Sequence, residues 1–314
     1  MLKIEGLCKS YGSREVLQNL TFTAYPQEVY GLLGPNGAGK TTTINILCNL
    51  LERDRGTIEF NQQPISENSK SLIGIAPQEN LLYKSLSCQE NLNFYGQLYG
   101  LNRNQRKERI NWCLEAVNLR DRANSIVSDL SGGMQRRLNI AVALIHQPQL
   151  VILDEPTTGL DIETRYEIWT LIKQLRESGM TILLTTHLLD EAEKLCQRIG
   201  ILKAGKIIAE GTLEELKQSM PAAEIITIKT LEEEKAITRG MELGYIPRRY
   251  GDELAFWLPE VQDFQTIVAE FKGISLDSVT RQSVSLEHIY LEIIDSTSGR
   301  RSPSTFGPVF WPGG

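Results

Sequence analysis

The chain has 314 residues, a net charge of −6 and a hydrophobic content of 41%. This length allows one large domain or two, and the mild acid excess gives no support for a nucleic-acid surface, which needs a basic patch. The five cysteines are scattered, which is typical of reduced thiols in a cytosolic protein. The sequence shows no signal-peptide pattern and no run of roughly 20 apolar residues, so we expect any membrane association to go through a partner.

Short apolar runs alternate with helical patterns through the first two-thirds of the chain. They suit strands that are buried on both faces of a sheet. Between two of them, Ile168, Leu171, Ile172 and Leu175 form one apolar helix face that stops at Gly179. This alternation predicts an α/β domain with a mainly parallel sheet. The expected strands are residues 29–33, 72–75, 150–153, 181–185 and 199–202.

The region from about residue 87 to 127 has no strand signal. Ser87 and Glu90 have the spacing of a capping box, which predicts the start of a helix. A second amphipathic helix is indicated by the apolar residues Ile110, Cys113, Leu114 and Val117. We therefore expect a helical subdomain, at about residues 80–145, inserted in the α/β domain.

The character of the sequence changes after a short helix that Thr212 and Glu215 are expected to cap and that ends at Pro221. Residues 221–295 predict a small α+β domain whose strand order the sequence leaves open, so the first domain spans residues 1–220. Residues 296–314 are rich in Ser, Pro and Gly and are predicted to be disordered. The expected elements are strands at 224–229, 245–250 and 253–258 and helices at 231–243 and 261–271.

A glycine-rich segment follows the first apolar run and fits the pattern GxxxxGK[ST]. Its glycines let backbone N–H groups turn toward phosphate oxygens, and the next helix adds its positive N-terminal end. Lys40 can reach the β- and γ-phosphates, and the Thr41 hydroxyl can bind Mg²⁺. A simple tight turn is the alternative, but a chance match in this strand–loop–helix setting is improbable. The candidate phosphate-binding residues are Gly34, Pro35, Asn36, Gly37, Ala38, Gly39, Lys40, Thr41 and Thr42.

Two carboxylates, Asp154 and Glu155, end the apolar run at residues 150–153. Asp154 can hold Mg²⁺ through water, and Glu155 can polarise the attacking water as a general base. The alternative is a strand that ends in acids at the surface. The phosphate-binding loop upstream favours the catalytic interpretation.

A second loop-to-helix segment, Leu130-Ser131-Gly132-Gly133-Met134-Gln135, predicts another anion site at a helix N-terminus; an ordinary helix cap is the alternative. With this segment the chain resembles the ATP-binding-cassette (ABC) ATPases, whose signature is LSGGQ. The resemblance covers roughly residues 1–215, because several family motifs occur in the family's order. It implies the P-loop cassette fold: a mainly parallel core, N-terminal antiparallel strands and a helical insertion.

The resemblance also implies roles for single residues. Tyr11 resembles the aromatic residue that stacks on adenine, and Asp161 belongs to a segment, Gly159-Leu160-Asp161, that resembles the D-loop. Gln78 resembles the Q-loop glutamine, which contacts the metal and the reacting groups, and His187 resembles the switch histidine near the γ-phosphate. Met134 departs from the fifth signature position. The residues expected to contact nucleotide from the signature are Ser131, Gly132, Gly133 and Gln135.

In this family two cassettes pair head to tail, and ATP lies between the P-loop of one and the signature of the other. The chain carries one copy of each motif, so the resemblance implies a homodimer with two equivalent sites. It implies further that a separate membrane-spanning permease holds the chain at the cytoplasmic face of the membrane. Residues 285–294 resemble the closing helix of bacterial drug, polysaccharide and lipid exporter cassettes, which favours export; a plain amphipathic end helix is the alternative.

Two other function classes are alternatives to a transporter subunit. A soluble ABC ATPase acting on ribosomes usually has two cassettes in one chain, and the DNA-repair type has a long coiled coil, for which no sustained heptads are present. A non-catalytic nucleotide-binding module is disfavoured by Glu155 and His187. The sequence does not identify the cargo.

Overall fold

The computed structural model describes residues 1–298, apart from the side chains of residues 67, 68 and 295–298. The chain divides into two compact units, the first ending at Leu213 and the second beginning at Glu214. The sequence prediction places this boundary slightly later, at residue 220. The predicted disordered tail lies outside the described residues, except for residues 296–298 at the end of a helix. In residues 1–298 no helix is long and apolar enough to cross a bilayer.

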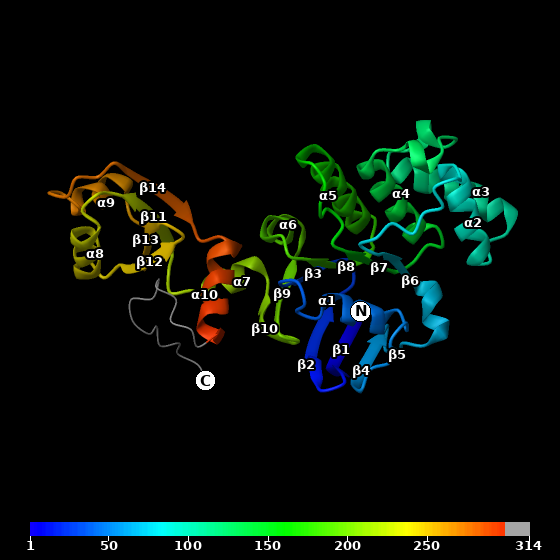
Figure 1. The fold of residues 1–314 in the computed structure, drawn as a ribbon, viewed down its shortest axis with the longest axis horizontal. Coiled ribbons are helices and arrows are strands. Elements are labelled where there is room, and N and C mark those ends of the chain that lie inside the picture. Colours follow the sequence, from blue (N-terminus) through cyan, green and yellow to red (C-terminus); the bar gives the residue numbers. More distant parts are fainter. Residues whose placement is uncertain (299–314) are drawn as a thin grey trace. The chain divides into compact units, whose positions relative to one another are not determined.

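An antiparallel sheet opens the first unit (Figure 1). Its strand order is β2-β1-β4-β5, and every neighbouring pair runs antiparallel. This sheet matches the N-terminal antiparallel strands that the family resemblance implied. The strands are β1 (Leu2–Tyr11), β2 (Arg14–Ala24), β4 (Arg55–Phe60) and β5 (Gln63–Pro64).

The larger sheet has the order β10-β9-β3-β8-β7-β6. All neighbouring strands are parallel except β10 and β9, so the predicted parallel core is confirmed. The carboxyl ends of β3, β7 and β8 lead into the loops that carry the predicted site. The strands are β3 (Val29–Leu33), β6 (Ile73–Ala76), β7 (Leu150–Asp154), β8 (Thr181–Thr186), β9 (Arg198–Lys203) and β10 (Lys206–Gly211).

The expected helical insertion is present between β6 and β7. Its first helix begins at the predicted capping box: Ser87 Oγ accepts from the Glu90 N–H, and Glu90 Oε2 accepts from the Ser87 N–H at 2.8 Å. The helices of the first unit are α1 (Lys40–Leu47), α2 (Cys88–Leu98), α3 (Arg103–Ala116), α4 (Gly132–Leu144), α5 (Ile162–Glu177), α6 (Leu189–Leu195) and α7 (Leu213–Gln218), which continues into the second unit. Three 3₁₀ segments are Glu67–Leu72, Arg120–Arg122 and Val127–Asp129.

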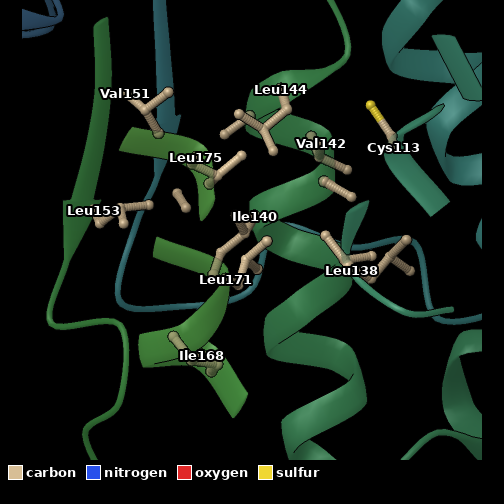
Figure 2. Packing of buried hydrophobic residues seen from close by; sticks show 14 of the residues in the cluster. Cys113, Leu138, Ile140, Val142, Leu144, Val151, Leu153, Ile168, Leu171 and Leu175 are labelled. Carbon is tan, nitrogen blue, oxygen red and sulfur yellow. The ribbon is translucent and has the colours of Figure 1, made fainter. Parts of the chain in front are cut away.

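Both faces of the parallel sheet are covered by apolar side chains. Leu150 and Ile152 of β7 belong to the cluster shared with the antiparallel sheet, whereas Val151 and Leu153 belong to the cluster formed with α4 and α5. Figure 2 shows the second cluster, in which residues of α4 and α5 point toward β7. Burying one such side chain contributes about 1.5–3 kcal/mol. This two-sided burial explains why the strands are apolar without alternation.

The second unit has the order strand–helix–strand–strand–helix–strand, followed by a closing helix. Its sheet order is β12-β13-β11-β14, and all pairs are antiparallel. This arrangement is the ferredoxin-like βαββαβ fold, and it supplies the strand order that the sequence left open. The elements are β11 (Glu224–Lys229), α8 (Glu233–Glu242), β12 (Ile246–Tyr250), β13 (Glu253–Leu258), α9 (Phe264–Glu270), β14 (Ser278–Ser283) and α10 (Leu286–Ser298).

Candidate functional site

The glycine-rich loop after β3 wraps around the side chain of Lys40. Gly39 is the N-cap of α1 and has φ 113°, a conformation that residues with a Cβ rarely adopt; a Cβ there would meet the Leu17 side chain at 2.6 Å. Lys40 is only 4% exposed, and its Nζ donates to Gly34 O at 2.7 Å and Pro35 O at 3.2 Å. The loop therefore holds a single buried ammonium at the N-terminal end of a helix.

The two predicted carboxylates follow β7 and differ in their partners. Thr185 Oγ1 donates to Asp154 Oδ1 at 2.5 Å. Glu155 lies against polar groups from three other loops: Lys40 Nζ is 3.2 Å from its Oε1, and His187 Nδ1 and Gln78 Nε2 are 3.1 Å and 3.3 Å from its Oε2. The structure thus brings together residues from the loops after β3, β6, β7 and β8.

The pKa values of the two carboxyl groups are shifted in opposite directions. Burial raises the pKa of Asp154, and the negative charge of Glu155 adds to this shift. Burial also disfavours the ionised form of Glu155, but His187 and Lys40 together outweigh it and lower the pKa of this carboxyl. These neighbours therefore favour the ionised form of Glu155.

A cavity of about 390 Å³ opens over the loop. Tyr11, half exposed, lies at its rim, and Thr41 and Thr42 continue its wall along the first turn of α1. Arg14 and Val16 also line it and were not predicted, because β2 carries no motif; only their closeness to Tyr11 in the chain pointed to them. The residues that line the cavity are Tyr11, Arg14, Val16, Asn36, Gly37, Gly39, Lys40, Thr41, Thr42, Gln78 and Glu155.

The signature segment lies outside this cavity. Ser131 and Gly132 are exposed, and Ser131 Oγ caps α4 by accepting from the Met134 N–H at 3.2 Å. Gln135, a predicted nucleotide contact, points back into its own loop, where Nε2 donates to Leu130 O at 3.0 Å and Val127 O at 3.3 Å. The described chain does not bring its signature and its P-loop into one pocket.

The predicted D-loop residue is tied to the signature rather than to the phosphate loop. Asp161 caps α5: Oδ1 accepts from the Thr164 N–H at 2.9 Å and Oδ2 from the Thr164 hydroxyl at 2.8 Å. These bonds lower the pKa of Asp161. Gly133 packs so closely on Thr164 that an added Cβ would lie 2.3 Å from its Cγ2. Signature and D-loop therefore form one contiguous surface.

Comparisons with known proteins agree with this geometry. The profile of the ABC transporter family matches residues 17–158. The chain is 37% identical over 296 residues to Nod factor export ATP-binding protein I of Cupriavidus metallidurans, covering 93% of this chain and 97% of that protein. It is 43% identical over 231 residues to linearmycin resistance ATP-binding protein LnrL of Bacillus subtilis, covering 73% and 74%.

Solved structures also match about two-thirds of the chain. An ATP-binding subunit of an ABC transporter has a TM-score of 0.63 and 31% identity, and the match covers 69% of this chain and 92% of that one. A dimeric ATP-binding cassette in a post-hydrolysis state, bound to ADP and phosphate, has a TM-score of 0.61 and 28% identity, covering 68% and 98%.

Proposed function

Because this chain belongs to the ABC transporter family of ATP-binding proteins, which are ATPases coupled to transport, we propose that the cavity over the P-loop is its ATP site. Lys40 and the backbone N–H groups of residues 36–39 hold the β- and γ-phosphates. Tyr11 stacks on the adenine, and the neighbouring Arg14 lies where it can reach the nucleotide. The buried ammonium of Lys40 inside the loop supports this assignment.

The oxygen donors beside the P-loop fit Mg²⁺. Thr41 and Gln78 line the cavity, and Asp154 lies close enough to Lys40 for the ammonium to stabilise its carboxylate. Hydroxyl, amide and carboxylate oxygens are the ligands that this hard cation takes, usually together with waters and substrate phosphates. A bound Mg²⁺ supplies charge neutralisation of the phosphates.

We propose that Glu155 is the general base. Its contacts with Lys40, Gln78 and His187 are the observation that carries the proposal, because they fix this carboxylate where the loops after β3, β6, β7 and β8 meet. In this position Glu155 polarises the water that attacks the γ-phosphate, Gln78 orients that water, and His187 stays beside the γ-phosphate.

We propose further that two copies of the chain pair head to tail. The exposed Ser131 and Gly132 then face the phosphates held by the partner's P-loop, and Gly133 and Asp161 support that surface from behind. The dimeric solved cassette supports the pairing. Each ATP-dependent closure and each reopening after hydrolysis then transmits movement to a membrane partner.

The Glu155→Gln variant tests the base and the dimer together. It keeps the size of the side chain and removes its basicity, so we expect loss of ATP turnover and an ATP-dependent dimer in size-exclusion chromatography. The same variant without nucleotide is the control and should remain monomeric. A Glu155→Gln protein that hydrolyses ATP at the wild-type rate contradicts the assignment of the base.

The permease is proposed to dock on the helical insertion. An apolar groove of about 290 Å³ lies between the end of α1 and α2, and Leu50, Leu98 and Tyr99 line it. Exposed aromatic rings continue the apolar surface along α2. The ring of Phe94 packs edge-on against that of Tyr83, with centroids 4.8 Å apart. Such a surface suits a short apolar segment of a membrane subunit. We propose that this docking holds the chain at the cytoplasmic face of the membrane.

Leu98→Glu tests this docking surface. Leu98 is 71% exposed, so the charge should not unfold α2 but should weaken co-purification with a polytopic membrane protein encoded beside this chain. Leu231→Glu, at an exposed leucine of the second unit, is the matched control. Equal recovery of the permease with Leu98→Glu and with Leu231→Glu argues against docking at α2.

We propose that transport is outward, since one relative is named for Nod factor export and another for linearmycin resistance. These names describe other proteins and do not identify the cargo of this chain. The ribosome- or DNA-associated alternative gains no support from relatives and solved cassettes with transport-related names. Efflux from cells that depends on Glu155 is the expected result; ATP-dependent accumulation inside cells contradicts export.

A further inference from the structure

Arg136, on α4, is a buried arginine whose hydrogen bonds all go to backbone oxygens of the catalytic loops. It is 5% exposed. Its Nε donates to Pro156 O at 2.8 Å, and its Nη2 donates to Asp154 O at 2.7 Å. Its Nη1 donates to Gln78 O at 3.1 Å and also to Pro77 O. One guanidinium therefore joins the signature helix to the loops after β6 and β7.

The oxygens that Arg136 binds bracket the proposed base. Glu155 has φ 46°, a left-handed conformation that costs a residue with a Cβ on the order of 1–3 kcal/mol. Arg136 holds the carbonyl before it and the carbonyl after it, while the Glu155 N–H donates to Thr185 O at 3.0 Å. The strained conformation is thus fixed on both sides, and Gln78 is held by the same group.

The chemistry of the side chain suits this task. Burial lowers the pKa of Arg136 to about 10, so the guanidinium remains charged at neutral pH. Its planar fork of five donors can serve several diverging carbonyls at once, which a single ammonium cannot do. The cost of burying the charge is offset only if those carbonyls stay in place.

We propose that Arg136 is a positioning residue that couples the signature segment to the geometry of Glu155 and Gln78 in the same chain. The proposal rests on the function given above. In the head-to-tail dimer, Ser131 touches the ATP held by the partner, and α4 carries that contact to Arg136 less than two turns away. The guanidinium of Arg136 then fixes the backbone of Glu155 in its own chain. Nucleotide bound at one site of the dimer thereby changes the position of the base at the other site.

Arg136→Lys keeps the charge and removes the fork, and Arg109→Lys is its control. Arg109 is also a buried arginine that donates to backbone oxygens of the α4 region, Ile145 O at 3.3 Å and Leu144 O at 2.8 Å, but at the opposite end from the signature. For the full chain we expect Arg136→Lys to lower kcat at least about tenfold and to change ATP affinity less than about twofold. Arg109→Lys should keep kcat per folded molecule.

A double-mutant cycle with Ser131→Ala tests the coupling itself. If both residues act through one link, the fold-loss of kcat in the Ser131→Ala/Arg136→Lys double variant is smaller than the product of the two single fold-losses. In the Ser131→Ala/Arg109→Lys double variant it equals that product. A normal kcat for Arg136→Lys, a loss that only follows its folded fraction, or multiplicative effects with Ser131→Ala would overturn the proposal. An inactive wild type or an active Glu155→Gln instead refutes the proposed function.

Discussion

Two glycine-containing segments precede helices in the first unit, and they differ in what their own chain supplies. The loop before α1 is completed within the chain: Lys40 is buried, and Gly34, Pro35 and Glu155 hold its ammonium. At the start of α4, Ser131 and Gly132 are exposed, and Ser131 Oγ accepts only from the Met134 N–H of this helix. Among the described residues, no buried lysine completes this anion-binding arrangement as Lys40 completes the first. The contrast supports the proposal that the first segment binds nucleotide within one chain and the second only in a dimer.

Replacing Lys40 with Ala should have the largest effect, because it removes the charge from the segment that is complete. Charged hydrogen bonds of this kind contribute about 1.5–3 kcal/mol, which corresponds to roughly 10- to 100-fold in ATP affinity. Turnover should fall at least as much. Nucleotide affinity by fluorescence and the steady-state ATPase rate measure this, with circular dichroism as the check on folding. Full activity in a folded Lys40→Ala protein contradicts the P-loop assignment.

Replacing Ser131 with Glu should separate binding from turnover. The new carboxylate faces the partner's phosphates and blocks closure of the dimer, so ATPase activity should fall about 100-fold. ATP binding to the monomer should stay nearly unchanged, because Lys40, Thr41 and Tyr11 are untouched. If Ser131→Glu loses ATP binding as completely as Lys40→Ala, the signature acts within its own chain and the comparison between the two segments fails.

Mixing the two variants gives a second test of the same contrast. A hybrid dimer of Lys40→Ala and Ser131→Glu chains has one composite site with both defects and one with neither. Activity that returns on mixing therefore supports action in trans, provided that one intact site suffices. A control mixture of Lys40→Ala with itself should stay inactive.

The same contrast decides what the sequence could predict. Strands such as β3 and β7 were predictable because apolar side chains cover both faces of the sheet, and the motif residues were predictable because their spacing is local. Arg136 was not, since its partners lie far away in the chain and no pattern links it to Glu155. The left-handed conformation of Glu155 likewise arises only from tertiary contacts.

The second unit shows the other limit of sequence reasoning. Strands β11 and β13 were predicted with their observed bounds, because they form the apolar centre of the sheet. Strand β14 was missed: its sequence, SVTRQS, is polar and mostly exposed, and it lies at an edge of the sheet. An edge strand without alternating burial carries no period-2 signal, and without it the ferredoxin-like order could not be assembled.

Replacement by alanine should affect the stability of the protein differently at the two signature glycines, Gly132 and Gly133. A Cβ at Gly133 would meet Thr164 at 2.3 Å, so Gly133→Ala should destabilise the protein by about 1–3 kcal/mol through overpacking. At Gly132 the added carbon would meet no atom within 4 Å beyond its chain neighbours and the backbone of its own helix, so Gly132→Ala should be neutral or slightly stabilising. Chemical denaturation measures both; equal losses would show that the exposed side of this segment is not free.

The smallest predicted effect concerns the C-terminal end of α4, where the contacts are made within the same chain. His146 follows this helix; its ring stacks on Tyr99 with centroids 3.8 Å apart, and its Nε2 lies 3.2 Å from Ile73 O. Burial lowers the pKa of His146 from 6.5 to about 4. Between these two values the unfolded chain binds more protons than the folded one, so the free energy of unfolding should fall as the pH is lowered through this window.

The His146→Phe variant isolates this contribution, because it keeps an aromatic ring against Tyr99 and cannot titrate. Its intrinsic stability at pH 7 should be somewhat lower than that of the wild type, since the polar contact with Ile73 O is lost. Between pH 7 and pH 5, however, the wild type should lose more stability than the variant, and urea midpoints at the two pH values measure the difference. The protons of other groups change equally in both proteins and cancel. Identical pH slopes would mean that His146 is not held neutral, and that the far end of α4 is less firmly anchored than its contacts with Tyr99 and Ile73 indicate.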